Sequence, residues 1–455
     1  MFFTRDRDFY KTLVRLAIPI ALQNAVTFAV NFADNLMVGT LGDSAISGVY
    51  VGNQLQTVLQ MFVAGIEGAI LILAAQYWGK RDTGSIRKIA SIGVRFAVLV
   101  GVLITLVAFL FPSQIMRIFT SDASVIEMGT PYVRVVSLSY LFFCISQVLI
   151  ASMRAVETAK IGLFVSCVAL IVNVSLNYVL IFGKLGFPAL GVTGAAIATL
   201  ISRIVESTVM VVYVRLIDRK LCLRFKDLLK NDRRLTRDFL RYGMPIVGGQ
   251  IVWSVNMMGQ TMILGRFDAG VIAATSIAGM LHNMMYIAMN GFSSAVGIIT
   301  GKTVGAGRID KIREYSRTTQ VIFLGIGVLS GIAVFLLRDP FISMYNASPA
   351  AVEYSRQFIN VISITIVGTC YQAACLFGLV KSGGDIAFVF KNDTIFVFLV
   401  VLPSAILASY LGAPPWVVFA CLKSDQILKC LVAVVKINRY NWMKNLTHDN
   451  TETEA

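Results

Sequence analysis

Long apolar runs constrain this chain more than any other feature of its sequence. A helix needs about 20 apolar residues to cross the hydrocarbon core of a bilayer. With 56% hydrophobic and 14% charged residues, a chain of 455 residues carries more apolar surface than a soluble fold could bury. We therefore predict an all-α membrane protein with twelve transmembrane helices, and place them at 13–38, 46–76, 89–111, 126–152, 160–183, 190–216, 242–265, 271–300, 317–338, 352–379, 392–411 and 415–437.

The basic residues indicate how these spans are oriented. Of the 40 Lys and Arg residues, 30 fall before the first span, after the last, or in every second connection, and ten of these lie in 215–241. Only about five fall in the other connections: Arg117, Arg134, Lys184, Arg266 and Arg338. Cytoplasmic loops are enriched in Lys and Arg. We therefore expect a multi-pass protein of the cell (inner) membrane with both termini in the cytoplasm, and no nucleic-acid partner despite a net charge of +15.

Residues that carry enzyme chemistry are sparse. Six of the seven cysteines lie in apolar spans without a CxxC motif, and the chain has only two histidines, His282 and His448. A membrane enzyme would more often gather His, Asp or Cys near one face. We expect no enzyme activity, no cofactor and no metal site other than a possible Na⁺ site.

The two halves of the chain repeat one another. AIPIALQNAVTFAVNFADNLMVG, from Ala17, aligns with GMPIVGGQIVWSVNMMGQTMILG, from Gly243, at an offset of 226 residues that persists for more than 100 residues. Each half has six spans, so the repeats have the same orientation in the membrane. We predict an N-terminal six-helix lobe (1–216), a cytoplasmic basic linker (217–241), a C-terminal six-helix lobe (242–437) and a cytoplasmic tail (438–455). Two similar lobes favour a transporter over a channel.

A carboxylate in the first span needs an explanation. Burying Asp34 in a bilayer costs about 2.5–3.5 kcal/mol on insertion scales. At 100° per residue it shares a narrow helix face with Gln23, Thr27 and Asn31, and this polar stripe should face protein or water. Two other polar residues, Asn173 and Asn177, are four residues apart on one face of the fifth span, at a matching depth.

Two interpretations of these residues stay open. Asp34, Asn173 and Asn177 can supply a small site of oxygen atoms for H⁺ or Na⁺, or the asparagines can serve only as interhelical hydrogen-bonding groups. Gln260 stands at the position of the second half that is equivalent to Asp34 in the first. A cation that needs a charged ligand would therefore bind in the N-terminal lobe.

Other polar or adaptable residues are candidates for a substrate cleft. Glu67 is either a functional acid or a residue of a water-filled cleft, and the methionines of the seventh and eighth spans suit varied ligands as well as ordinary packing. Two charged pairs, Arg203 with Glu206 and Asp425 with Lys429, are either local ion pairs or a cytoplasmic gate. The cleft candidates are Gln23, Asn31, Glu67, Gln250, Asn256, Gln260, Met257 and Met284.

The first span also contains a proline, Pro19, 15 residues before Asp34. Proline lacks a backbone donor and weakens a helix at this point. Pro19 is therefore either a hinge at which the span bends or simply the start of the helix.

The chain resembles the multidrug and toxic compound extrusion (MATE) family. The matching segments are the first span with Pro19 and Asp34, QYWGKRD (76–82), MRAVETAKIG (153–162), NVSLNYVLIFG (173–183), GFPALGVTGAAIAT (186–199) and the second GMPI (243–246). The resemblance implies twelve helices in two lobes, with Pro19 at the bend of the first span. It also implies an ion site at Asp34, Asn173 and Asn177, with Thr199 as a weaker match for a hydroxyl of the sixth span.

One departure concerns the second lobe. Family members with a cation site there carry acids in the seventh and tenth spans, whereas this chain reads PIVGGQIVWSVN and GTCYQAAC. A cation site in the C-terminal lobe is therefore in doubt.

These observations give a functional expectation. We expect an H⁺- or Na⁺-coupled antiporter that exports cationic or amphipathic small molecules such as drugs by alternating access. It would act in the lipid bilayer as a monomer. The alternative is a flippase or exporter of lipid-linked or flavin-type substrates on the same two-lobed plan, with Arg95, Arg203 and Arg356 as its candidate cleft cations.

Overall fold

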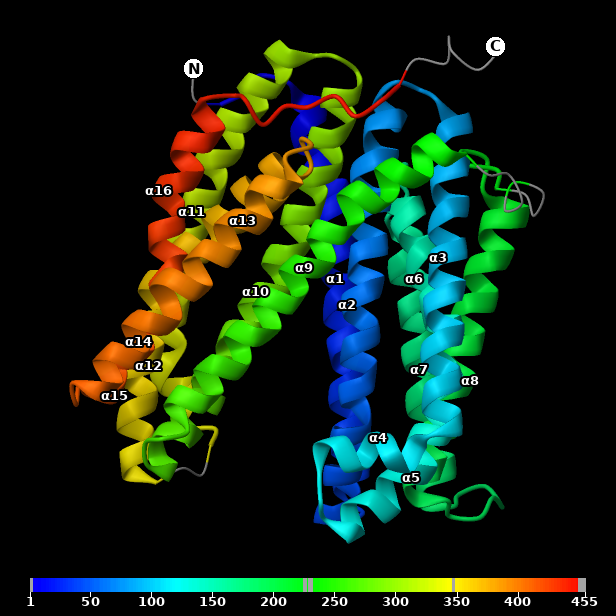
Figure 1. Cartoon of the computed structure of the whole chain (residues 1–455), viewed down its shortest axis with the longest axis vertical. Coiled ribbons are helices and arrows are strands. Elements are labelled where there is room, and N and C mark those ends of the chain that lie inside the picture. The colour runs from blue at the N-terminus through cyan, green and yellow to red at the C-terminus, as the bar shows by residue number, and fades with distance from the viewer. Residues whose placement is uncertain (1–2, 224–226, 228–231, 346–347, 449–455) are drawn as a thin grey trace. The chain divides into compact units, whose positions relative to one another are not determined.

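The computed structural model describes residues 3–223, 227, 232–345 and 348–448, and over these residues the chain consists of helices and the turns between them (Figure 1). Helices occur at all twelve predicted spans. In the first half they are α1 (Arg7–Gly39), α2 (Asp43–Gly79), α3 (Thr83–Leu110), α5 (Ala123–Ser137), α6 (Ser139–Ala155), α7 (Lys160–Phe182) and α8 (Gly191–Val212), which the π-helical segment η1 (Tyr213–Ile217) extends.

The second half has more interruptions within its spans. Its helices are α9 (Arg233–Leu264), α10 (Ala269–Gly305), α11 (Ile309–Ile342), α12 (Pro349–Gln372), α13 (Ile386–Phe396), α14 (Leu402–Tyr410), α15 (Pro415–Lys423) and α16 (Asp425–Asn438). Two π-helical segments, η3 (Ala373–Lys381) and η4 (Val397–Val401), continue α12 and join α13 to α14.

Two breaks in predicted spans have local causes. The span at 126–152 is the pair α5 and α6, bent by 47°, and the Ser137 carbonyl freed at the bend accepts a hydrogen bond from the Thr105 hydroxyl at 2.9 Å. The span at 415–437 breaks at Ser424, whose hydroxyl donates to the Cys421 carbonyl at 2.7 Å. Such side-chain bonds compete with the helical backbone pattern.

Helix length and apolarity support most of the predicted spans. Within the described ranges, nine helices are long and apolar enough to cross a membrane, and ten if the bent α5–α6 pair is one span. The predicted spans outside this count are 242–265, which lies in a helix with a strongly charged first part, and the broken span at 415–437. The short α4 (Pro112–Phe119) was not among the predicted elements.

Contacts between residues divide the chain into two compact units. Unit 1 contains Met1–Ala21 and Gly248–Ala455, and unit 2 contains Leu22–Val247. The two boundaries, after residues 21 and 247, are 226 residues apart, which is the offset of the sequence repeat. α1 and α9 therefore each begin in one unit and continue in the other.

Pro19 and Pro245 lie two residues before these boundaries, inside α1 and α9. The alternative in which Pro19 starts the first helix is therefore wrong, because twelve helical residues precede it. Residues 233–241 of the predicted linker form the first turns of α9. Residues 224–226 and 228–231 of that linker lie outside the described residues, and the predicted lobe boundaries stay a prediction.

The repeat is also visible in packing. In unit 2, a Cβ atom at Gly101 would lie 3.2 Å from Leu141 and 3.4 Å from the sulfur of Cys144. In unit 1, a Cβ atom at Gly327 would lie 3.0 Å from the Cα of Val367 and 3.3 Å from the Cβ of Cys370. Each of these three residues is 226 positions after its counterpart, so the same close helix approach is built twice, and the internal repeat is confirmed.

Basic segments that the sequence places on one side of the membrane meet within each unit. In unit 2, Lys88 pairs with Asp232 at 3.0 Å, and Lys220 donates to the Val156 carbonyl at 2.8 Å. These contacts join the first part of α3 and the α6–α7 connection to the α8–α9 connection at one end of the unit.

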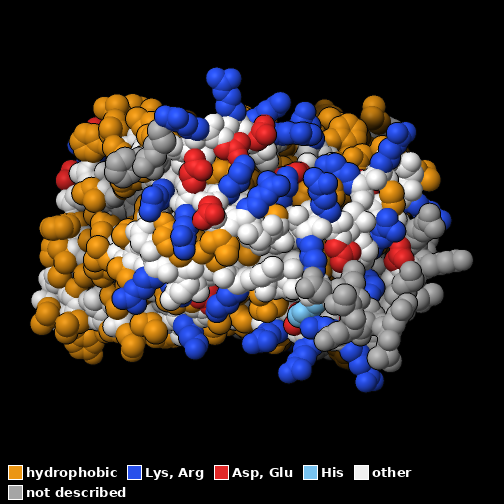
Figure 2. Space-filling view, turned by 90° about the horizontal axis from the view of Figure 1, so that it is seen from above, with side chains coloured by type: hydrophobic (Ala, Val, Ile, Leu, Met, Phe, Trp, Pro, Cys, Tyr) orange, Lys and Arg blue, Asp and Glu red, His pale blue; other side chains and the backbone are white. Residues whose placement is uncertain are grey.

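Unit 1 shows the same organisation. Asp6 accepts hydrogen bonds from Lys311 at 2.6 Å and Tyr315 at 2.7 Å, which lower the pKa of Asp6 to about 2. Asp385 pairs with Lys436 at 2.7 Å and with Lys444 at 2.8 Å. Figure 2 shows the face seen from above in Figure 1, where Lys and Arg side chains are spread widely and acidic ones are fewer.

Candidate functional site

Asp34 lies at a cavity within unit 2. The cavity has a volume of about 300 Å³ and receives side chains from α1, α2, α5, α7 and α8. Gly183, with φ of +65°, ends α7 and lets the chain turn back, and Gly194 then packs directly on the Leu180 backbone. This close approach sets α8 beside α7, so both helices face Asp34. Among the polar residues that line the cavity are Asn31, Asp34, Asn53, Tyr132, Asn173, Thr199 and Arg203.

The predicted ion-site residues come together around Asp34. The Asn177 amide nitrogen donates to one Asp34 carboxylate oxygen and, at 3.2 Å, to the Asn173 side-chain oxygen. Asn173 and Asn177 are buried, as their common face predicts. The Asn177 side-chain oxygen is also buried and has no hydrogen-bond partner among the described residues. The Asn177 nitrogen therefore contacts oxygens of both Asp34 and Asn173, and the Asn177 oxygen is left as an unsatisfied acceptor. The roles of these residues stay a prediction.

Arg203 belongs to the same cavity, and the sequence suggested it both as one half of a charged pair and as a candidate cleft cation. Its guanidinium pairs with Glu206 at 2.6 Å and lies 5.0 Å from the centre of the Phe143 ring. The local ion pair is therefore present. Because Glu206 neutralises Arg203, Asp34 carries the surplus charge among the described lining residues.

Several polar lining residues were not predicted, among them Tyr132 and Asn53. The Tyr132 hydroxyl donates to the Asn53 side-chain oxygen at 3.0 Å, and both residues face the Asp34 cavity. A tyrosine and an asparagine in α5 and α2 gave no positional signal in the sequence, because their meeting depends on how three helices pack.

Two residues of the first half that were predicted for a substrate cleft, Gln23 and Glu67, lie outside the Asp34 cavity. Gln23 is 3% exposed and accepts a hydrogen bond from Arg154 at 2.7 Å. Glu67 lies near the same arginine, close enough to interact electrostatically. Neither lines the Asp34 cavity, whereas Asn31 does.

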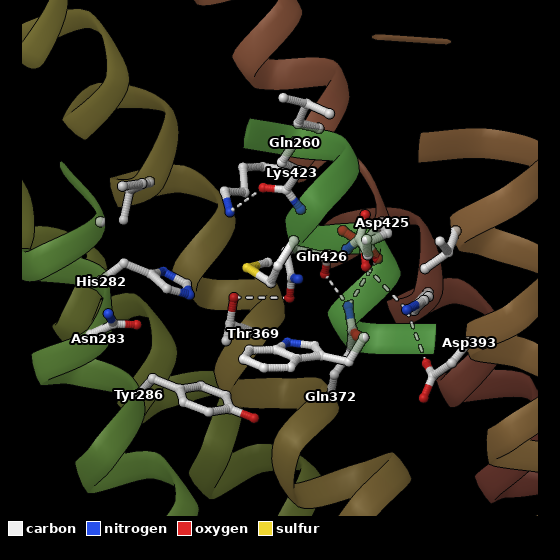
Figure 3. Close-up of a pocket in the computed structure, with 18 of the residues that line it drawn as sticks. Gln260, His282, Asn283, Tyr286, Thr369, Gln372, Asp393, Lys423, Asp425 and Gln426 are labelled. Atoms are coloured by element: carbon white, nitrogen blue, oxygen red, sulfur yellow. Dashed lines mark hydrogen bonds and ion pairs between the residues drawn. The ribbon is translucent and has the colours of Figure 1, made fainter. Parts of the chain in front are cut away.

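Unit 1 contains a second cavity, with a volume of about 290 Å³ (Figure 3). Three residues predicted for a substrate cleft, Asn256, Met257 and Gln260 of α9, line it. Gln250 and Met284 are not among its lining residues, and Met284 is exposed.

The charged groups of this cavity come from several helices. Lys429 of α16 pairs with Asp393 of α13 at 2.9 Å and with Asp425 at 3.0 Å, so the predicted Asp425–Lys429 pair is present. Lys423 donates to the Gln260 side-chain oxygen at 3.1 Å (Figure 3). Asp393 and Lys423 were not predicted as site residues, although each is a charged residue within an apolar span. The absence of acids from the stretches PIVGGQIVWSVN and GTCYQAAC therefore did not leave the cavity without carboxylates.

A family model matches both halves of the chain. The model is described as MatE, and it matches residues 19–179 and 245–411, segments that begin 226 residues apart. The chain belongs to the MatE family. Members of this family are transporters and not enzymes, so this MatE chain is a multi-pass membrane transporter of small molecules.

Individual relatives of the MatE chain agree with this assignment. It is 27% identical over 355 residues to the probable multidrug resistance protein NorM of Thermotoga maritima, covering 78% of this chain and 76% of that protein. It is 24% identical over 412 residues to the protein of the same name from Halalkalibacterium halodurans, covering 89% of each.

Solved structures show the fold. A MATE protein crystallised in complex with MaL6 matches with a TM-score of 0.85 at 19% identity, covering 94% of this chain and 96% of that one. An outward-facing multidrug resistance MATE transporter matches with a TM-score of 0.85 at 18% identity, covering 96% and 99%. The predicted fold class, an all-α membrane protein of two six-helix lobes, is confirmed.

Proposed function

We propose that this MatE chain is an ion-coupled antiporter that exports cationic or amphipathic small molecules, such as drugs, from the cytoplasm by alternating access. The observation that carries the proposal is the Asp34–Asn177–Asn173 cluster at the unit 2 cavity. The relatives named as multidrug resistance proteins support export of such compounds. The coupling ion, H⁺ or Na⁺, binds at Asp34 and enters as the compound leaves.

The cluster offers a mechanism for ion binding. In the arrangement described, the Asn177 amide nitrogen donates to the Asp34 carboxylate, while the Asn177 oxygen is unsatisfied. If the Asn177 side-chain amide rotated by half a turn, its oxygen would face Asp34 in place of its N–H groups. Oxygens of Asp34, Asn173 and Asn177 would then converge, which is the hard-oxygen environment that Na⁺ requires. A proton on Asp34 would be donated to the same Asn177 oxygen.

Ion binding changes the charge of the cavity. Because Glu206 already neutralises Arg203, a cation at Asp34 removes the surplus negative charge. Neutralising a carboxylate at membrane depth lowers the cost of keeping it away from water. The ion thus biases the packing of α1 against α7, and a local charge change of this kind can shift a two-state element.

The location and assembly follow from the same proposal. The protein acts as a monomer in the inner membrane, with both termini in the cytoplasm, and needs no cofactor beyond the coupling ion. The gathering of basic segments at one end of each unit supports this orientation.

The flippase alternative receives less support. A carrier of lipid phosphates needs cations that are available to the substrate. Arg203 pairs with Glu206, Arg356 pairs with Asp339 at 2.8 Å, and Arg95 donates to the carbonyl of Ser91 at 3.4 Å.

The test is counterflow of a cationic dye in proteoliposomes, with a Na⁺ or a pH gradient imposed separately. We expect one gradient to drive uphill transport in wild type and Asp34→Asn to reduce it at least about tenfold, since one lost charge interaction is worth about 1.4 kcal/mol or more. The exposed Asp8→Asn is the matched control and should behave as wild type. Undiminished gradient-driven transport by Asp34→Asn would refute the coupling site.

A further inference from the structure

Unit 2 contains a second acid within a span, apart from the Asp34 cavity. Glu67 lies in α2 and is partly buried, and it does not line that cavity. Among the described residues it has no hydrogen-bond or ion-pair partner, and the Arg154 guanidinium of α6 acts on it from a greater distance. A carboxylate at membrane depth is costly when no partner compensates for it. The position of Glu67 therefore needs an explanation.

The arginine that acts on Glu67 is hydrogen-bonded to a different residue. The Arg154 Nη2 group donates to the Gln23 side-chain oxygen at 2.7 Å, while the buried Nε group has no partner in the part of the chain that the structure describes. Nε and Nη2 form one edge of the guanidinium, and a carboxylate binds such an edge through two parallel hydrogen bonds. Glu67 and Gln23 are therefore competitors for the same edge of Arg154.

Gln23 depends on this hydrogen bond because it is enclosed. It is 3% exposed, and a Cβ atom at Gly162, in the first turn of α7, would lie 2.5 Å from its side-chain oxygen. An acceptor enclosed in this way cannot turn to water when its donor leaves, and an unpaired buried acceptor is costly. Loss of Arg154 would therefore favour a different packing of α1 at Gln23.

The cluster lies where α1 and α9 change unit. Gln23 is the second residue of α1 that belongs to unit 2, and it follows Pro19 by four residues. Next to Glu67 in α2, a Cβ atom at Gly68 would lie 2.5 Å from the side chain of Ile246, so the first part of α9 packs directly on this stretch. A charge change at Glu67 is thus placed to act on both helices beside their prolines.

The other half of the repeat has the same packing without the acid. At the offset of 226, Gly65 corresponds to Gly291, which packs directly on the backbone of Ala21 in α1. Glu67 corresponds to Ser293, whose hydroxyl donates to a backbone carbonyl of η3. The close approach of the helices therefore does not require a carboxylate at this position.

The charged and titratable neighbours of Glu67 come from α6. They are the Arg154 guanidinium and the Cys144 thiol, both of which interact with Glu67 electrostatically. The neighbours of this stretch from α1, α9 and α3 are uncharged, and they are Gln23, Ile246, Val247 and Gly93. α5 packs on α2 around Gly52, about four turns away. Arg154 is therefore the group that responds most directly to the charge of Glu67.

We propose that Glu67 is a second acid of this transporter, one that binds H⁺, and that its charge decides which partner Arg154 holds. With a proton on Glu67, Arg154 stays on Gln23 and holds α1 beside Pro19, which is the arrangement described. When that proton passes to water, the Glu67 carboxylate takes the Nε–Nη2 edge of Arg154, and Gln23 loses its donor. α1 then repacks at its weak point. The inference rests on the proposed function, because it gives the alternating-access cycle a second step controlled by a proton.

Infrared difference spectroscopy of the purified full chain tests the proton and the exchange of partners together. Spectra at low and high pH are compared in the Asp34→Asn protein, so that Asp34 does not contribute. We expect raising the pH to convert a protonated carboxyl signal into a carboxylate signal and to shift a side-chain amide signal, because Gln23 loses its hydrogen bond. Adding Glu67→Gln should remove both changes, whereas adding Gln23→Leu should remove only the amide change.

A matched variant controls for the loss of any glutamate. The exposed Glu127→Gln of α5 should leave both changes as they are in Asp34→Asn. If Glu67→Gln removes no carboxyl signal, the proton on Glu67 is overturned, and a carboxyl change without an amide change overturns the exchange of partners. If the Glu67→Gln protein does not fold, the amide change and its loss in Gln23→Leu still decide.

Transport gives a second readout. Efflux of a cationic dye down its own gradient, without an ion gradient, is measured over a pH series in the Asp34→Asn protein. We expect the rate to rise at least about fivefold from the acid to the alkaline end, because an unpaired buried acceptor shifts packing by this factor or more. Adding Glu67→Gln should keep the slow rate at every pH, and adding Gln23→Leu the fast rate. Two residues with only structural roles would not give opposite constant rates.

The two proposals fail in different ways. If no ion gradient drives wild-type transport but both infrared changes depend on Glu67, the antiport proposal fails and the exchange of partners at Arg154 stands. If wild-type transport is ion-driven but Glu67→Gln removes no carboxyl signal, only this inference fails.

Discussion

At the scale of single residues, Asp34 and Gln260 show how one repeated position can serve two purposes. Asp34 is held by the Asn177 amide, and Gln260 holds the Lys423 ammonium. A carboxylate can gain or lose a cation, whereas an amide keeps its charge of zero at every pH. In the proposed mechanism ion coupling therefore belongs to Asp34, and we expect Gln260 to influence which compounds the unit 1 cavity accepts.

The Gln260→Ala variant tests this difference. It removes the hydrogen-bond acceptor of Lys423 and leaves Asp34 untouched, so we expect substrate preference to change severalfold while ion coupling is retained. The measurement is inhibition of dye counterflow by a panel of anionic and cationic competitors. Gln260→Glu is the informative companion, because a carboxylate beside Lys423 would neutralise it and should weaken the anionic competitors most. Complete loss of coupling in Gln260→Ala would contradict the division of roles.

At the scale of elements, α1 and α9 are unusual because each belongs to both compact units. α1 packs with unit 1 up to Ala21 and with unit 2 from Leu22, and α9 changes unit after Val247. Pro19 and Pro245 lie two residues before these points. A proline inside a helix removes one backbone hydrogen bond and introduces a steric clash, so each helix is weakest close to where it passes between units.

The Pro19→Ala variant tests a hinge in α1. Restoring the backbone hydrogen bond removes a local cost of about 3 kcal/mol. We expect a higher thermal unfolding temperature, export slowed severalfold and ion binding at Asp34 largely retained. A spin label at the exposed Leu36, near the C-terminal end of α1, should move less with pH or Na⁺ than in wild type.

Pro340→Ala is the matched control for this variant. Pro340 lies in α11 near its end and away from both unit boundaries, so its removal should not change the motion of α1. Equal label movement in wild type and Pro19→Ala would remove the basis for a hinge at this proline.

At the scale of the whole molecule, the repeat and the distribution of charge determine the architecture together. Equivalent glycines, Gly101 and Gly327, support equivalent helix contacts in the two units. Within each unit, basic connections meet at one end. From the even number of spans and the positive-inside rule we predict that both termini lie in the cytoplasm.

Fusions to alkaline phosphatase test this orientation, because the enzyme is active only outside the cytoplasm. We expect activity for a fusion after Leu185, in the turn between α7 and α8, and no activity for a fusion after His448 at the C-terminal end of the described chain. A fusion after Lys80, in the α2–α3 turn, is the internal control and should also be inactive. The opposite pattern would show that the protein is inverted.

The sequence by itself determined the helices, the repeat and the core of the candidate ion site. A segment in lipid must satisfy its own backbone hydrogen bonds, so it forms a helix, and its side chains must be mostly apolar. Each span is therefore visible in the sequence as a continuous apolar run. Asn173 and Asn177 share a helix face because they are four residues apart, and their depth matches that of Asp34. These relations depend only on helix geometry and on position along the chain.

Only the tertiary structure decided which helix faces meet. It placed Arg203 with Asp34, turned Gln23 toward Arg154, and assembled the second cavity from α9, α10, α12, η3, α13, η4, α15 and α16. Lys423 and Gln260 are 163 residues apart in the sequence, and no pattern within either helix indicates that they meet. Their contact results from packing between helices, in which side-chain shape and polar pairing act over long separations in sequence, so local periodicity could not predict the charge of that cavity.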